Sequence, residues 1–278
     1  MIVQHNMAAL NTNRQLGITN KSLSKSTEKL SSGYRVNRAA DDAAGLSISE
    51  KMRGQIRGLN QASANAQDGQ SLIQTAEGAL GEIHEVIQRM RELTVQAAND
   101  TNVSADRNAI ALELQALSSE INRISSQTEF NTMKLLSGGF SNKGLQVGAN
   151  KNQLITFSIS AMTAKQLGVT VSAIAAKVKD GAATSSKISP LISVVNKALS
   201  VVSQQRSKLG ALQNRLDHTI ANADNMAENL QSSESKIRDV DMAKEMVTYS
   251  AKSILQQAGQ SMLAQANQAT QGVLSLLR

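Results

Sequence analysis

The chain has 278 residues, a net charge of +7, one proline, no cysteine, no tryptophan, and aromatic side chains at only 2% of its positions. The lack of cysteine excludes disulfides, cysteine-ligated zinc sites and thiol chemistry. Few aromatic residues and many alanines favour helices packed along their lengths over a globular core, and the scarcity of proline lets such helices run without interruption. Basic and acidic residues are interspersed without flanking aromatics, which argues against a nucleic-acid-binding surface.

The first 30 residues predict a helix with a narrow apolar stripe. Leu16, Leu23 and Leu30 recur every seven residues, which is the spacing of a coiled-coil seam. The neighbouring positions are mostly Asn, Thr, Ser and Gln, so this helix has too little apolar surface to form a core alone and requires another helix. Gly33 is expected to end it in a left-handed conformation.

A long helix is predicted over residues 41–99. It would start at Asp41 and Asp42, whose carboxylates suit the positive end of a helix dipole. Apolar and small residues then follow a spacing of four and three, with a shift near Gly69. Because glycine is unfavourable inside a helix, Gly69, Gly78 and Gly81 are expected to mark a close approach of a neighbouring helix.

A third helix is predicted to follow a turn at 99–103, with Ser104 as its cap. The short turn implies that this helix folds back antiparallel on the second one. Its apolar stripe comprises Ile110, Leu114, Leu117, Ile121 and Ile124.

The period changes to two in the middle of the chain. Apolar residues alternate with polar ones at Leu145 and Val147 and again over 155–159, on either side of a turn-rich stretch at 148–153. This pattern predicts a β-hairpin. Residues 161–189 have weak periodicity and are interpreted as a short surface insertion.

Helical periodicity returns after Pro190 and continues to a break expected at 232–235. The last helix has an apolar stripe, and the C-terminus is also apolar, which usually indicates a partner surface. No stretch of about 18 apolar residues is present, so no membrane insertion is predicted. The stripe comprises Val247, Ala251, Ile254, Ala258 and Met262, and the terminal cluster includes Leu274, Leu276 and Leu277.

No combination of residues in the sequence predicts catalysis. His84 and Glu85 begin a zinc-protease motif, but the second ligand position holds Gln88 instead of histidine. The glycine-rich stretch at 138–144 lacks the Lys-Ser/Thr ending of a phosphate-binding loop. We therefore expect a protein that is not an enzyme and that holds no cofactor or metal.

Several stretches of the sequence resemble bacterial flagellins. The resemblance covers roughly residues 1–160 and 190–278, and it departs in the middle, where large flagellins carry one or two outer domains. The stretches that carry it are 30–46 (LSSGYRVNRAADDAAGL), 88–93 (QRMREL), 128–131 (TEFN), 146–150 (QVGAN), 209–216 (LGALQNRL), 263–268 (LAQANQ) and 273–278 (VLSLLR).

Together with the periodicity, the resemblance implies a mainly α fold, a long antiparallel helical bundle or coiled coil with a small β-hairpin region. Three parts are expected: a terminal coiled coil of 1–40 with 236–278, a helical rod with the hairpin of 41–160 with 190–235, and the insertion 161–189. By resemblance, the chain would polymerise into the flagellar filament for swimming motility, and its terminal helices would fold on assembly. The residues expected to carry polymerisation are Leu16, Leu23, Leu30, Ile254, Met262, Leu274, Leu276 and Leu277.

The resemblance also implies partners and a location. The chain would leave the cell through the flagellar type III apparatus without a cleaved signal peptide, assisted by an export chaperone and cap proteins, and would be extracellular in the flagellum. A host Toll-like receptor would contact Arg89, Leu93 and Glu113, although Arg89 could equally pair with Glu85 or Glu92 on its own helix. Two alternatives stay open, a hook–filament junction protein and a basic helical module that binds nucleic acid or an acidic surface.

Overall fold

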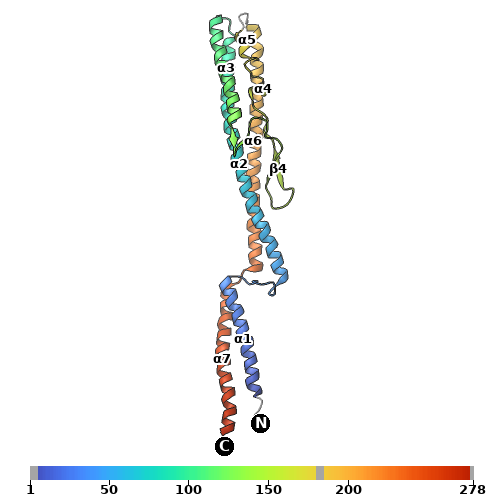
Figure 1. Cartoon of the computed structure of the whole chain (residues 1–278), viewed down its shortest axis with the longest axis vertical. Coiled ribbons are helices and arrows are strands. Elements are labelled where there is room, and N and C mark those ends of the chain that lie inside the picture. The colour runs from blue at the N-terminus through green and yellow to red at the C-terminus, as the bar shows by residue number, and fades with distance from the viewer. Residues whose placement is uncertain (1–5, 180–184, 276–278) are drawn as a thin grey trace. The chain divides into compact units, whose positions relative to one another are not determined.

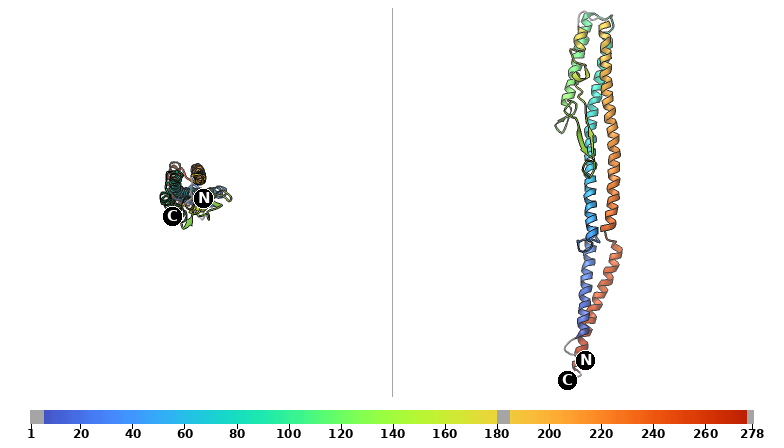
Figure 2. Two further views of the ribbon diagram at one scale, coloured as in Figure 1. Left: turned by 90° about the horizontal axis from the view of Figure 1, so that it is seen from above. Right: turned by 90° about the vertical axis from the view of Figure 1, so that its right-hand side faces the viewer.

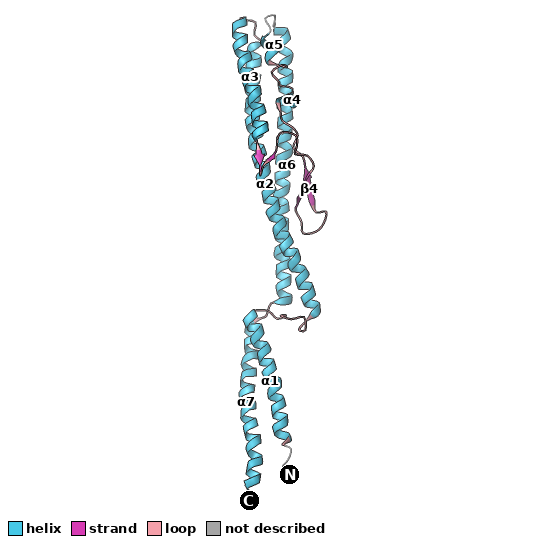
Figure 3. Ribbon diagram, in the orientation of Figure 1, coloured by secondary structure: helices cyan, strands magenta, loops and turns pink. Residues whose placement is uncertain are grey.

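The computed structural model describes residues 6–179 and 185–275, with side chains described for 6–179 and 186–268. Long helices dominate, as Figures 1 and 3 show, and the predicted mainly α fold is confirmed. The long helices are α1 (Met7–Ser32), α2 (Ala43–Ala97), α3 (Ser104–Gln127), α6 (Ser185–Arg238) and α7 (Met242–Ser275). The short elements are α4 (Ala164–Leu167), α5 (Ala175–Lys179), β1 (Glu129–Phe130), β2 (Met133–Lys134), β3 (Lys143–Gln146) and β4 (Leu154–Phe157).

The contacts divide the chain into two compact units. Residues 1–56 and 228–278 form the terminal unit, and residues 57–227 form the middle unit. Both α2 and α6 contribute residues to each unit. Of the described helices, none combines the length and the hydropathy that crossing a membrane requires. The expected domain boundaries at 40 and 236 stay predictions.

The middle unit has a continuous apolar core. From Leu80 to Met90, α2 buries one side chain every three or four residues, and α3 buries Ile110, Leu114 and Ile121 against them. Leu117 and Ile124 are partly buried at the edge of this core. Figures 1 and 2 show α3 beside α2, and the predicted return of α3 along α2 is therefore confirmed.

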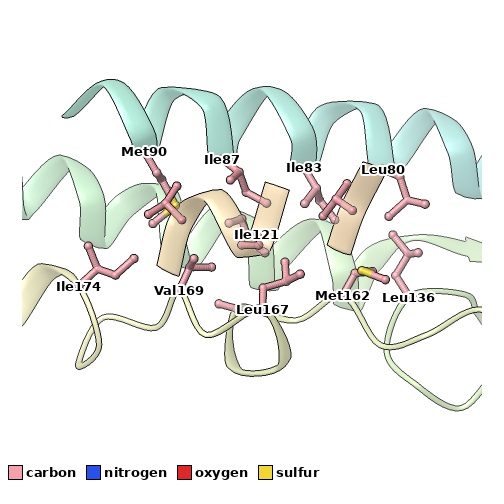
Figure 4. Close-up of a cluster of buried hydrophobic side chains, with 14 of the residues drawn as sticks. Leu80, Ile83, Ile87, Met90, Ile121, Leu136, Met162, Leu167, Val169 and Ile174 are labelled. Atoms are coloured by element: carbon pink, nitrogen blue, oxygen red, sulfur yellow. The ribbon is translucent and has the colours of Figure 1, made fainter. Parts of the chain in front are cut away.

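Residues 162–178 are part of that core, so the expectation of a surface insertion is wrong for this segment. Met162, Leu167, Val169 and Ile174 are almost completely buried. Figure 4 shows these four side chains pointing toward Ile121 and the α2 residues. The segment lacks a regular period because it reaches the core through two short helices and the turn at Gly168, which has a φ of 75°.

The predicted β-hairpin is confirmed, with Leu145 of β3 opposite Ile155 of β4. It lies against α2, where Ala149 contacts Gly58 and Leu145 contacts Gly69. The close approach expected at Gly69 is therefore correct, although the neighbour is the hairpin and not a helix. For Gly78 and Gly81 the expectation is wrong, because an added Cβ would meet no atom within 4 Å at either position.

Three helix boundaries differ from the sequence prediction. Val103 precedes α3, and its N–H donates to Asp106 Oδ2 at 3.2 Å, so Ser104 is the first helical residue and not the cap. Helix α6 begins at Ser185 and includes Pro190, since neighbouring buried residues hold its first turns in the core. The break expected at 232–235 is absent, because α6 continues to Arg238 and Ser233 Oγ donates back to Asn229 O at 2.8 Å.

The glycines of α2 provide a matched pair of substitutions. In Gly58→Ala the new methyl would meet Ala149 Cβ at 2.8 Å and Cα at 3.1 Å. We expect this variant to destabilise the middle unit by about 1–3 kcal/mol through overpacking. The control Gly78→Ala meets nothing and should stabilise the helix by roughly 1 kcal/mol. Thermal unfolding followed by circular dichroism tests both, and a shift of the same sign in the two variants would contradict the assignment.

Candidate functional site

In the terminal unit α1 packs along α7 (Figure 1). The predicted stripe of Leu16, Leu23 and Leu30 lies in this seam and is half-buried. An ideal Cβ on Gly259 would lie 3.2 Å from Leu16 Cδ1, so the two helices approach closely at this glycine. Near the other end of α1, Asn6 Nδ2 donates to Ala266 O at 2.9 Å. The seam is therefore a contact within one chain.

The apolar stripe of α7 lies on a different side of the helix. Val247, Ile254 and Met262 are 71%, 65% and 60% exposed, and Ala251 and Ala258 between them are also exposed. The seam positions Lys252, Gly259 and Ala266 repeat every seven residues and do not include any member of the stripe. We call the stripe, together with the exposed Leu255, the outer face of α7.

A smaller apolar surface lies on α1. Met7, Leu10 and Ile18 are exposed, and their spacing along the helix places them away from Leu16 and Leu23. The terminal pair thus exposes apolar side chains on both helices. Its described residues contain little core: Ser26 is the one fully buried residue of α1, and no residue of α7 up to 268 is fully buried.

The structure places the other polymerisation candidates as follows. Ile254 and Met262 belong to the outer face of α7. Leu274 lies within α7, and its side chain is not described. Leu276 and Leu277 lie outside the described residues.

The two linkers of the terminal unit pair with each other. Arg35 N donates to Arg238 O at 2.7 Å, and Val240 N donates to Gly33 O at 3.0 Å. Tyr34 and Asp239 thereby form an antiparallel bridge. We call residues 33–35 and 238–240 the linker clasp. Gly33 also ends α1 with a φ of 76°, as the sequence predicted, whereas its bond to Val240 was not foreseen.

Ion pairs surround the clasp. Lys25 Nζ lies 2.8 Å from Asp41 Oδ1, and this hydrogen bond, followed by one from the backbone of Arg38, lowers the pKa of Asp41. Arg238 Nη1 lies 2.6 Å from Glu50 Oε1 and lowers the pKa of Glu50 in the same way. The sequence did not signal the pairing of Glu50 with Arg238. Asp42 behaves as expected of a helix-start acid, since its Oδ1 accepts from Gly45 N at 2.8 Å.

The three receptor candidates lie in the middle unit, and they differ in exposure. Arg89 Nε of α2 lies 2.9 Å from Glu113 Oε1 of α3, and Arg89 Nη1 lies 3.1 Å from Glu92 Oε2. These two carboxylates, Glu92 first, raise the pKa of Arg89, which stays charged. Leu93 is only 2% exposed and belongs to the core.

No catalytic arrangement is found in the described part of the chain. There, no group of three His, Cys, Asp or Glu side chains is placed to hold a metal ion. His84 lies on α2 with Gln88 as a neighbour, 3.5 Å between their Nε2 atoms, and has no second ligand beside it. The outer face of α7 and the apolar surface of α1 can bind other molecules, and their apolar side chains cannot carry out acid–base or nucleophilic chemistry.

Two family models match most of the chain. The bacterial flagellin N-terminal helical region matches residues 3–141, and the bacterial flagellin C-terminal helical region matches residues 192–277. These matches bracket the short segment in which the sequence departs from large flagellins.

Similar proteins agree with the family models. A flagellin of Halalkalibacterium halodurans is 54% identical over 278 residues, and one of Bacillus subtilis is 51% identical over 304 residues; both alignments span 100% of each chain. A solved flagellar hook-associated protein of Vibrio parahaemolyticus shares the fold, with a TM-score of 0.62 at 15% identity, over 72% of this chain and 100% of that one. The chain therefore belongs to the bacterial flagellin family, whose members are structural subunits of the flagellar filament and not enzymes.

Proposed function

We propose that other copies of this chain cover the outer face of α7, and that this burial drives growth of the filament. The observation that carries the proposal is the exposure of Val247, Ile254 and Met262, which α1 leaves uncovered. Burying an aliphatic side chain of this size contributes about 1.5–3 kcal/mol. Three such side chains per subunit would supply a substantial share of the free energy of association.

A second surface makes the contacts directional. Met7, Leu10 and Ile18 of α1 would meet one neighbouring copy while the outer face of α7 meets another. Contacts between different surfaces that do not close into a ring generate an open helical polymer. Leu16, Leu23 and Leu30 would act indirectly in this scheme, by holding α1 on α7. Leu274, Leu276 and Leu277 stay predicted contributors.

The same surfaces support a proposal for folding on assembly. The described part of the terminal pair buries almost no side chain completely, so little burial within one chain offsets the entropy of ordering two helices. The middle unit, in contrast, has its own core. We propose that the terminal helices become ordered when neighbouring copies cover them, as disordered segments do when they fold on binding.

We also propose an export chaperone, cap proteins and an extracellular location for this chain. The exposed apolar side chains of the terminal helices must be shielded from water before the subunit reaches the filament. This favours an export chaperone as a transient partner. Cap proteins at the growing end would then guide each subunit into place. The flagellin family forms its filament outside the cell, and we propose that this chain acts there.

A host Toll-like receptor is proposed as a further partner. The observation that favours it is the exposed pair of Arg89 and Glu113, which places opposite charges from α2 and α3 side by side on one surface. A charged pair of this kind suits recognition by complementary charges. Leu93 would support that surface from beneath and would not contact the receptor, because it is buried.

A charge on the outer face tests the proposed assembly. Ile254→Asp should raise the critical concentration for growth on filament seeds at least tenfold, because an unpaired carboxylate would be buried. The control Ile254→Leu keeps an apolar side chain and should grow normally. Sedimentation and negative-stain microscopy measure both. Normal growth of Ile254→Asp would contradict the assembly surface, and growth that stops after a few copies of the unmodified chain would favour the junction-protein alternative.

Acid should loosen the terminal helices in assembled material. The pKa values of Asp41 and Glu50 lie below their usual 3.8 and 4.5, so their ion pairs stabilise the folded unit above those values, and this is lost as the pH falls through the lowered ones. Both tyrosines, Tyr34 and Tyr249, lie in the terminal unit, and the chain has no tryptophan. The three phenylalanines lie in the middle unit and absorb at shorter wavelength, so circular dichroism read in the tyrosine band follows the terminal unit. Glu50→Gln should make the acid transition shallower, and an unchanged transition would contradict the role of Glu50.

Two substitutions separate contact from support at the receptor surface. Arg89→Ala should reduce activation of a Toll-like receptor reporter without changing the thermal unfolding of the middle unit. Leu93→Ala should lower the free energy of unfolding by about 2–5 kcal/mol, because it leaves a cavity in the core. Unfolding by denaturant provides the stability measurement. A Leu93→Ala chain of unchanged stability that fails to activate would indicate a direct contact instead.

A further inference from the structure

Arg238 makes side-chain contacts with two other parts of the terminal unit. Its guanidinium carbon lies 4.7 Å from the centroid of the Tyr34 ring, in the linker between α1 and α2. Its Nη1 bonds to Glu50 of α2, and its backbone oxygen accepts from Arg35 N. The side chain is only 13% exposed. Arg238, which ends α6 and belongs to the linker clasp, therefore ties the two strands of the clasp together and connects them to α2.

The clasp and the seam follow one antiparallel register. Gly33 bonds to Val240 at one end, Leu16 lies against Gly259 in the middle, and Asn6 bonds to Ala266 at the other end. Moving α1 away from the clasp therefore shifts every pair along the seam by the same amount.

The seam alone defines this register poorly. Leu16, Leu23 and Leu30 occupy equivalent positions, so a shift of seven residues would place Leu23 against Gly259 and again present a leucine to the glycine. Such a shift moves a helix by about 10 Å. The linker 33–42 is long enough to absorb that movement. The pairs Lys25–Asp41 and Glu28–Arg38 hold this linker along α1 and do not reach α7.

We propose that Arg238 is a positioning residue that fixes the heptad register of α1 on α7 through the linker clasp. The clasp sets which leucine meets Gly259, and the register then sets where Met7, Leu10 and Ile18 lie along the outer face of α7. A subunit in the shifted register would present its two assembly surfaces about 10 Å out of step and would fit its neighbours poorly. This inference rests on the proposed ordering of the terminal unit during assembly.

Cysteine pairs can report the register, because the chain has no cysteine of its own. The Leu16 Cβ and an ideal Cβ on Gly259 are 4.0 Å apart, which suits a disulfide. Leu16→Cys with Gly259→Cys should therefore cross-link within one chain of seeded filaments under mild oxidation. Leu23→Cys with Gly259→Cys reports the shifted register and should cross-link little. Non-reducing electrophoresis separates cross-links within a chain from those between chains.

Adding Arg238→Gln should reduce the Leu16 cross-link at least threefold and raise the Leu23 cross-link by a similar factor. The matched control is Arg53→Gln, because Arg53 also bonds to Glu50, at 3.0 Å, from within α2. It should change neither cross-link. The proposal is overturned if the Leu16 cross-link is unchanged in Arg238→Gln, or if Arg53→Gln has the same effect as Arg238→Gln.

A second variant covers the case in which Arg238→Gln does not assemble. Glu50→Gln removes the ion pair and leaves Arg238 stacked on Tyr34, and the same two reporters then decide: a switch toward the Leu23 cross-link supports the proposal, and an unchanged Leu16 cross-link overturns it. The thermal unfolding of the middle unit should be unchanged in every variant. If the unmodified chain itself does not grow on seeds, the proposed assembly fails and not the role of Arg238.

Discussion

The apolar residues of α7 are divided between two sides of the helix, and α1 covers only one of them. Gly259 allows α1 to approach closely on the seam side, whereas Ile254 and Met262 remain in water on the other. Among the residues that the structure describes, no other segment of the chain covers these two side chains. Burial of apolar surface is the dominant favourable term in association, so this uncovered side supports the proposal that other copies of the chain cover the terminal unit.

The middle unit shows the opposite arrangement. Three long helices and the segment 162–178 enclose side chains such as Leu80, Ile87 and Leu114 completely. Because this core is formed within one chain, it supports the proposal that the middle unit folds before assembly. The same protein thus combines a part with an enclosed core and a part with little core, and α2 and α6 contribute residues to both.

Sequence periodicity identified the helices and their apolar sides well, and it identified their partners less well. The heptads of Leu16, Leu23 and Leu30 gave the correct seam of α1, and the stripe through Ile254 was correctly chosen as apolar. A pattern of this kind shows that one side of a helix must be buried, and it does not show which other helix buries it. The exposed and the covered sides of α7 could therefore be distinguished only in three dimensions.

Three other features escaped the sequence for physical reasons. The buried side chains of 162–178 come from short helices and turns, which leave no period to detect. The clasp is formed by backbone hydrogen bonds, and backbone groups are the same at every residue, so Arg35 and Val240 carry no mark of their role. Leu93 was chosen by resemblance as a contact, and its burial could be seen only once the core was assembled.

The burial of residues 162–178 affects how this protein could be used to display foreign peptides. The weak periodicity of the segment suggests a place where sequence could be exchanged freely. Replacing it would, however, remove Met162, Val169 and Ile174 from the interior and open the space between the long helices. A graft would keep its carrier intact only if it were added beside these residues instead of in place of them. A segment that looks dispensable in the sequence is therefore part of the core that an engineered fibre would need.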